Sequence, residues 1–209
     1  MAARFARIGS TWLALALLAG CATGRYAAPP AQQSYDVRSD EALIVFMRVS
    51  SFGGAISSSI FDVTGEGEQI VGIPGPNEKL AHYAEPGRRR FMVIAENADF
   101  LEAELEAGKA YYAVITPRIG AWKARFSLHP FKQSPVEPEF ALGGPQHLKW
   151  LAECKLIDTP PSAAEWAANN AASIHAKRTS YVEKWSQKGS EELRARTLEA
   201  GDGLASALP

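Results

Sequence analysis

Cysteine is scarce in this sequence, and the two that occur lie far apart. Only Cys21 and Cys154 are present among 209 residues. If Cys21 is consumed by a modification, an odd cysteine remains, and the fold must hold without disulfides. We expect Cys154 to be a small buried hydrophobic side chain, and a reactive thiol is the alternative.

The sequence also lacks an excess of charge of either sign. Lys and Arg total 22 against 23 for Asp and Glu, which gives a formal net charge of −1 at pH 7. Proteins that bind nucleic acid need a basic stripe that displaces counterions from the phosphates. The composition therefore argues against a nucleic-acid partner.

A long apolar run is missing as well, since the N-terminal run at 12–18 is far shorter than the ~20 residues that span a bilayer as a helix. Arg4 and Arg7 precede this run, and the small residues Ala19-Gly20 follow it. These are the three parts of a secretory signal. We predict that residues 1–20 are a signal peptide.

The stretch Leu18-Ala19-Gly20-Cys21 resembles the lipobox of bacterial lipoproteins. The resemblance implies diacylation of the Cys21 sulfur, for instance with palmitate, cleavage before Cys21, and acylation of the new amine in many bacteria. Two or three acyl chains anchor a protein stably, at about 0.8 kcal/mol per buried methylene. Because Ala22, and not an aspartate, follows the cysteine, the family analogy favours the outer membrane, facing the periplasm. A plain secretory signal with a coincidental cysteine is the alternative.

The segment 21–40 is predicted to be a lipidated flexible tether. Residues 26–34 show no apolar period, and Pro29-Pro30 resists both helix and sheet. A flexible chain of this length has a typical end-to-end distance of roughly 25 Å.

The region 41–131 has the pattern of an all-β domain. Residues 42–49 form a continuous apolar run, typical of a central strand buried on both faces. Other short strands are expected between Gly- and Pro-containing turns, at 56–63, 68–73, 79–84, 90–96, 101–106, 110–116 and 122–128. This spacing favours a mainly β fold, a small antiparallel β-sandwich followed by C-terminal helices.

The C-terminal part has a different character. We expect 132–161 to be a linker with a short helix at 146–154, and 162–200 to be helical. Ser162 and Glu165 have capping-box spacing, so Ser162 is the predicted N-cap of a helix that runs to about residue 187. A second helix is expected at 191–200. One stripe of the long helix is expected to pack on the sandwich; an exposed partner-binding helix is the alternative. This stripe consists of Trp166, Asn170, Ile174, Tyr181 and Trp185.

The β region resembles a family of uncharacterised bacterial lipoproteins with PEGA-like domains, over roughly residues 41–130. The features that carry the resemblance are Arg48-x-x-Ser51-Phe52-Gly53-Gly54, Pro86-Gly87 with alternating Arg89, Phe91 and Val93, the segment Ala107-Gly108-Lys109-Ala110-Tyr111-Tyr112, and Gly120-Ala121-Trp122. The resemblance implies a small β-sandwich and an envelope location. It implies no known reaction and no catalytic residues, and it does not cover the C-terminal helices.

Motifs that carry chemistry are missing from the sequence. The four histidines are His82, His129, His147 and His175. Their spacing along the sequence matches no metal-binding motif, so only a zinc site formed by residues distant in sequence stays open. The run Ser57-Ser58-Ser59 is interpreted as the solvent face of a strand, not as a nucleophile. Gly65-x-Gly67 lacks the third glycine of a dinucleotide fingerprint. We therefore predict a protein that is not an enzyme, with no catalytic residue, cofactor or metal site.

Three groups of side chains have more than one interpretation. Glu102, Glu104 and Glu106 are expected to form the solvated face of a strand, although paired carboxylates can also do acid–base work. The run Arg88-Arg89-Arg90 is interpreted as charge that discourages edge pairing, with anionic lipid or cell wall as the alternative ligand. Trp122, Trp150, Trp166 and Trp185 also have two interpretations. Most of them are expected in the core, and the alternative is that they are exposed on one face and stack on sugar rings.

Together these patterns predict a membrane-anchored envelope lipoprotein that acts as a structural or protein-interaction module. Its expected partners are the membrane, through acylated Cys21, and an envelope protein. A glycan- or peptidoglycan-binding lipoprotein is the alternative, and a hydrolase with a site assembled from distant residues is a third hypothesis.

Overall fold

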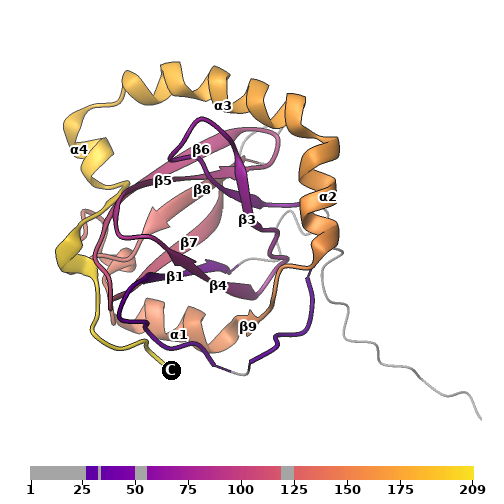
Figure 1. Cartoon of the computed structure of the whole chain (residues 1–209). Helices are drawn as coiled ribbons and strands as arrows, with labels where there is room; N and C mark the ends of the chain where they lie inside the picture. Colours follow the sequence, from indigo (N-terminus) through magenta and orange to yellow (C-terminus); the bar gives the residue numbers. More distant parts are fainter. Residues whose placement is uncertain (1–26, 33, 50–55, 119–124) are drawn as a thin grey trace, which may run out of the picture.

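The structure is a computed structural model, and it describes residues 27–32, 34–49, 56–118 and 125–209. Within these ranges, ten strands form two five-stranded sheets, and helices cover the outer faces of the sheets (Figure 1). The protein is therefore mainly β with helices toward its C-terminus, as the sequence predicts. None of the helices in these ranges has the length and hydrophobicity needed to cross a membrane.

Sheet I has the strand order β8-β7-β1-β4-β9. Its strands are Arg125–Pro130 (β8), Ala110–Arg118 (β7), Ala42–Arg48 (β1), Glu78–Ala84 (β4) and Lys155–Leu156 (β9). The central β1 pairs antiparallel with β4 but parallel with β7, and β9 pairs parallel with β4. Every residue of β1 is buried, as expected for the apolar run.

Sheet II has the order β10-β6-β5-β2-β3. Its strands are Thr197–Leu198 (β10), Ala98–Leu105 (β6), Gly87–Ile94 (β5), Ser59–Asp62 (β2) and Gln69–Gly72 (β3). Here β10 joins β6 in parallel, whereas the other pairs are antiparallel. Both sheets are thus mixed, and the prediction of purely antiparallel sheets is wrong. Alternation along one segment predicts a strand, but it does not encode the direction of a distant partner.

The two sheets share one apolar core. Side chains from sheet I, such as Ile44 and Phe46, meet side chains from sheet II, such as Phe91 and Leu101. The rings of Phe46 and Phe91 pack edge to face with centroids 5.2 Å apart. Full burial of such a side chain contributes about 1.5–3 kcal/mol to stability, so this shared layer makes a large contribution.

Each sheet also buries part of its outer face. The helices are α1 (Pro145–Glu153), α2 (Pro161–Asn169), α3 (Ala171–Ser186) and α4 (Ser190–Arg194). Leu151 of α1 packs against Leu43 and Val45 of sheet I, whereas Ile174 and Trp185 of α3 pack on sheet II. Figure 1 shows α1 and α3 on opposite sides of the two sheets. The predicted packing of the Trp/Tyr stripe is confirmed.

The helical segment differs from the prediction in its boundaries. The chain breaks between α2 and α3 at Asn170, where one long helix was expected. Ser162 is not the N-cap, because Pro160 takes that position and Pro161 begins α2. Proline suits the first turn, since the amide hydrogen it lacks would have no helical partner there. The second predicted helix, 191–200, ends at Arg194 because the chain then extends into β10.

The linker and the tether are more ordered than their composition suggests. The short helix predicted at 146–154 is confirmed as α1. Ala28, within the predicted tether, exchanges two backbone hydrogen bonds of 3.0 Å with Asp158. Nearby, the Tyr83 hydroxyl donates to the Asp36 carbonyl at 2.8 Å. The chain therefore contacts the domain at Ala28 and again at Asp36, whereas residues 21–26 and 33 of the predicted tether lie outside the described residues.

Candidate functional site

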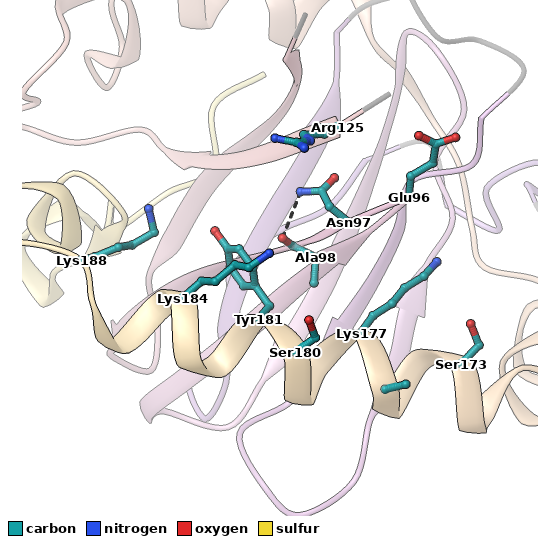
Figure 2. Close-up of a pocket in the computed structure, with 11 residues that line it drawn as sticks. Glu96, Asn97, Ala98, Arg125, Ser173, Lys177, Ser180, Tyr181, Lys184 and Lys188 are labelled. Carbon is teal, nitrogen blue, oxygen red and sulfur yellow. Dashed lines mark hydrogen bonds between the residues drawn. The ribbon is translucent and has the colours of Figure 1, made fainter. Parts of the chain in front are cut away.

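A cavity of about 590 Å³ lies between α3, the turn that joins β5 to β6, and the first residue of β8. Its lining includes four cations, which are Arg125, Lys177, Lys184 and Lys188, and one acid, Glu96. Figure 2 shows the lysines projecting from α3 and its C-terminal end toward the edge that carries Asn97 and Arg125. The cavity is therefore a cationic groove between a helix and the end of the sheets.

The helical period of α3 produces this arrangement. Ile174 and Trp185 are buried against sheet II, and Tyr181 is half-buried between them. Lys177 and Lys184 follow Ile174 and Tyr181 by three residues each, so they lie beside the apolar stripe on the same flank of the helix. Seven residues of helix rise about 10 Å. The lysines therefore form a row along one wall of the groove.

A buried ionic cluster fixes the base of this wall. The Tyr181 hydroxyl donates to Asp99 Oδ1 at 2.5 Å, and Arg196 Nη1 donates to Asp99 Oδ2 at 3.0 Å. The backbone amide of Leu128 also donates to Oδ2, at 3.2 Å. Asp99 has no solvent exposure. Because a buried carboxylate needs such partners, the cluster ties together β6, α3, β8 and the C-terminal segment.

Hydrogen bonds also hold the β5–β6 turn against its neighbours. Lys177 Nζ donates to the Ala95 carbonyl at 2.6 Å. Asn97 Nδ2 donates to the Ala98 carbonyl at 3.0 Å, and Asn97 Oδ1 accepts from the Phe126 amide at 3.3 Å. The turn is thus fastened to α3 on one side and to β8 on the other, so both walls of the groove are fixed before any ligand binds.

Arg178 fastens α3 to sheet II at a second point. Its guanidinium donates to four carbonyls of the β2–β3 turn, at 3.0 Å to Val63, 2.9 Å to Gly65, 3.0 Å to Glu66 and 3.2 Å to Gly67. It also pairs with Glu68 at 3.2 Å. The glycines considered for nucleotide binding therefore serve as backbone acceptors for a helix side chain.

The cations of the groove differ in their engagement. Lys188 pairs with Glu192, and Lys177 donates to a carbonyl as described. Arg125 and Lys184 are exposed, and neither forms an ion pair within the described residues. Guanidinium and ammonium groups recognise carboxylates and phosphates through charge-assisted hydrogen bonds. The arrangement is suited to binding an anion between strand and helix.

An apolar cavity of about 340 Å³ continues the groove toward α2. It shares Glu96, Ser173 and Lys177 with the cationic cavity. Its apolar lining consists of Ile56, Ile94, Ala95, Trp166 and Ile174. We call the two cavities together the α3 groove, with a cationic end and an apolar end.

The predicted lipid-attachment residue, Cys21, lies outside the described residues, as do the signal peptide 1–20 and Trp122. Cys154 is described, and it is buried as predicted, with 4% of its surface exposed. Burial raises the pKa of the Cys154 thiol to about 12. A thiol that stays protonated is a poor nucleophile, so Cys154 has the properties of a core residue.

The charged runs pair with each other across sheet II. Arg88 contacts Glu104 at 3.2 Å and Arg90 contacts Glu102 at 2.6 Å, as direct neighbours on β5 and β6. Strand β5 pairs with β2 only over Phe91–Ile94, and at the arginines it pairs with β6 alone, so the interpretation that they discourage edge pairing stays a prediction. Cross-strand ion pairs thus explain two members of each charged run, whereas Arg89 pairs with Glu85 and Glu106 pairs with Lys109.

The four histidines lie apart in the fold. His147 is fully buried and stacks on Phe131 at 4.0 Å, His129 stacks on Phe140 at 4.2 Å, and the exposed His175 contacts Glu68 at 3.1 Å. Burial lowers the pKa of His82. Among the described residues, no three His, Cys, Asp or Glu side chains are grouped to hold a metal ion.

Serine and tryptophan positions depart from the predictions in part. Ser58 and Ser59 are buried, so the solvent-face interpretation is wrong for both. The Ser58 hydroxyl donates to the Pro74 carbonyl at 3.1 Å, beside the buried Arg48. Trp150 packs on sheet I, whereas Trp166 and Trp185 pack on sheet II, so the structure does not gather these three tryptophans on one face.

Sequence reasoning missed the α3 groove. The helical period predicts the apolar stripe of α3, but it does not by itself mark Lys177, Lys184 and Lys188 beside that stripe as a binding surface. Arg125 and Asn97 come from strands and a turn, and only the fold brings them to the lysines. No protein-family model matches the chain, and no curated protein matches its sequence.

Proposed function

We propose that this protein is a membrane-anchored lipoprotein of the bacterial envelope that acts as a protein-interaction module and not as an enzyme. The observation that carries the anchoring is Leu18-Ala19-Gly20-Cys21 behind a positively charged and apolar N-terminus. Acylated Cys21 holds the protein in the outer membrane, with the folded domain in the periplasm. Two packed sheets fit the PEGA-like sandwich that the sequence resembles.

The α3 groove supports the binding role. It combines cations, of which Arg125 and Lys184 have no ion-pair partner in the part of the chain that the structure describes, with amide and hydroxyl groups and an apolar end. Hydrogen bonds hold its walls in place. Sites that bind ligands are concave, with apolar walls and a few fixed polar groups. The α3 groove is thus the proposed binding site for a partner, and acylated Cys21 is the proposed anchor that holds this site at the membrane.

Substitution of Cys21 tests the anchor. We expect Cys21→Ser to abolish labelling with a palmitate analogue and to release the protein from the membrane fraction, because the acylated atom is the sulfur. Cys154→Ser is the matched control and should leave both labelling and fractionation unchanged. If Cys21→Ser is still labelled and membrane-bound, the lipoprotein assignment is wrong.

A further inference from the structure

We propose that the α3 groove binds an acidic peptide segment of an envelope protein, with carboxylates at the cationic end and one apolar side chain at the Trp166 end. The inference rests on the proposed function of an interaction module and names the chemistry of its partner.

The charge of the groove is complementary to an acidic ligand. The whole chain has a formal net charge of −1, yet the cationic end presents four basic side chains and one acidic side chain. Positive charge is therefore concentrated in the groove, whereas the rest of the chain has more acidic than basic side chains. Arg125 and Lys184, which have no ion-pair partner in the described ranges, approach the same space from opposite walls (Figure 2). An anionic group between them would contact both cations.

The spacing of the lysines fits an extended peptide. Lys177 and Lys184 are separated by about 10 Å along α3. An extended chain rises about 3.3 Å per residue, and side chains on one face recur about every 6.6 Å. An extended segment of five to seven residues is about 16–23 Å long, so it would reach past both lysines and place its carboxylates along the lysine row. Asn97, Ser173 and Ser180 add polar groups beside it.

The size and lining of the apolar end limit which apolar group of the ligand can bind there. Its volume is about 340 Å³, and its walls include Ile56, Ile94 and Trp166. This cavity has room for a large apolar side chain, such as leucine or phenylalanine. Two acyl chains of a phospholipid would extend far beyond so short an apolar lining. The shape therefore favours a peptide with one apolar residue next to its acids over an anionic lipid.

The groove is preorganised for such a ligand. Lys177 is held by the Ala95 carbonyl, and Tyr181 is held by Asp99. A ligand that binds walls already in place avoids the entropy cost of ordering them. Lys184 and Arg125, which are exposed, supply the adjustable contacts.

A fluorescence anisotropy titration tests the proposal on the mature chain, residues 21–209, made soluble by Cys21→Ser. The probe is a labelled seven-residue peptide with one leucine followed by alternating aspartate and serine. The matched control peptide has asparagine at each aspartate position. We expect binding of the aspartate peptide, weakened by salt, and no saturable binding of the asparagine peptide.

Two charge variants locate the binding. The double variant Arg125→Gln with Lys184→Gln should lower the affinity for the aspartate peptide by about fivefold to tenfold, because two solvent-exposed ion pairs are lost. Lys149→Gln with Lys155→Gln removes the same charge from exposed positions on the sheet I side and should change affinity less than about twofold. Circular dichroism confirms that both variants fold. Equal affinities for the two variants, or equal binding of the two peptides, would overturn the proposal.

Two further probes separate the competing ligands. Vesicles of phosphatidylglycerol in phosphatidylcholine test an anionic lipid, and purified cell wall tests a glycan. If either is bound through Arg125 and Lys184 while the aspartate peptide is not, the peptide assignment is wrong and that ligand replaces it. These assays use a soluble chain, so their failure leaves the acylation test on Cys21 unaffected. A failed acylation test, in turn, would not alter the peptide titration.

Discussion

Asp99 is a carboxylate without solvent exposure, and polar groups of three other elements contact it. Tyr181→Phe removes one charge-assisted hydrogen bond and leaves the carboxylate in place. We expect a loss of about 1.5–3 kcal/mol in the free energy of unfolding, measured by urea denaturation. Tyr83→Phe is the control, because its hydroxyl bonds a backbone carbonyl at the surface. A loss equal to that of the control would mean that Asp99 does not depend on Tyr181.

Gly203 lies where a side chain has no room. A Cβ at this position would come within 2.6 Å of Tyr111 Cζ and 2.7 Å of Lys109 Cδ, whereas a Cβ at Gly201 would meet nothing within 4 Å. We expect Gly203→Ala to lower the free energy of unfolding by about 1–3 kcal/mol, because the buried Tyr111 ring must move. Gly201→Ala should stay within about 0.5 kcal/mol of the parent. If both variants unfold at the same urea concentration, the close approach does not constrain the fold.

His147 gives the fold a specific dependence on pH. Burial lowers the pKa of His147 to about 4, from 6.5 for an ordinary histidine. Between these values the unfolded chain binds a proton that the folded chain does not. The neutral His147 therefore makes its full contribution to the free energy of unfolding above about pH 6.5. This contribution, about 3 kcal/mol, is lost as the pH falls toward 4. Below that pH both states are protonated and the effect levels off.

The measurement compares urea denaturation of the parent and of His147→Gln from pH 7 to pH 4. Glutamine can still accept the hydrogen bond that the Gly143 amide donates to His147 Nδ1 at 3.0 Å. We expect the difference in unfolding free energy between the two proteins to shrink or reverse as the pH falls. A constant difference across this range would contradict the assignment.

At the scale of elements, Arg178 is the main polar connection between α3 and the β2–β3 turn. Arg178→Met removes its bonds to the turn carbonyls while keeping an unbranched apolar side chain. We expect a loss of about 1–2 kcal/mol in stability and faster amide hydrogen exchange in α3 and the turn, with β1 unaffected. Lys184→Met, an exposed substitution on the same helix, should change exchange little. Uniform acceleration across the domain would show that α3 does not open separately.

The sequence reveals strands better than it reveals their partners. The apolar run at 42–49 and the alternation at 101–106 predict β1 and β6 correctly, because burial leaves a local pattern. The two-residue strands β9 and β10 have no pattern of their own, since each only adds hydrogen bonds to an existing edge. Parallel pairing is likewise a property of the assembled chain.

The same distinction applies to the candidate site. Local sequence predicts the apolar stripe of α3, because Ile174, Tyr181 and Trp185 recur with the helical period. The meeting of Lys184 with Arg125 depends on where α3 lies across sheet II, and no local pattern encodes that placement. The buried partners of Asp99 are missed for the same reason, since they come from distant segments.

At the scale of the whole molecule, the domain extends beyond the predicted boundary at residue 131. Met47 and Tyr112 on sheet I, and Phe61 and Phe100 on sheet II, are fully buried among side chains that include later residues of the chain. We expect residues 27–131 alone to bind a hydrophobic dye and to give poorly dispersed NMR spectra, because these faces would meet water. Residues 27–209 should fold cooperatively. A well-dispersed spectrum from the shorter fragment would contradict this.

The backbone pairing of Ala28 with Asp158 limits the distance between the folded domain and the proposed anchor at Cys21. Cys21 and Ala28 are seven residues apart, and a flexible chain of that length would typically span about 15 Å, against roughly 25 Å for a tether that reaches residue 40. If Cys21 is acylated as proposed, so short a connection would keep the domain beside the lipid headgroups. A partner would have to come to the membrane surface, so membrane-proximal segments of other anchored proteins are the ones within reach.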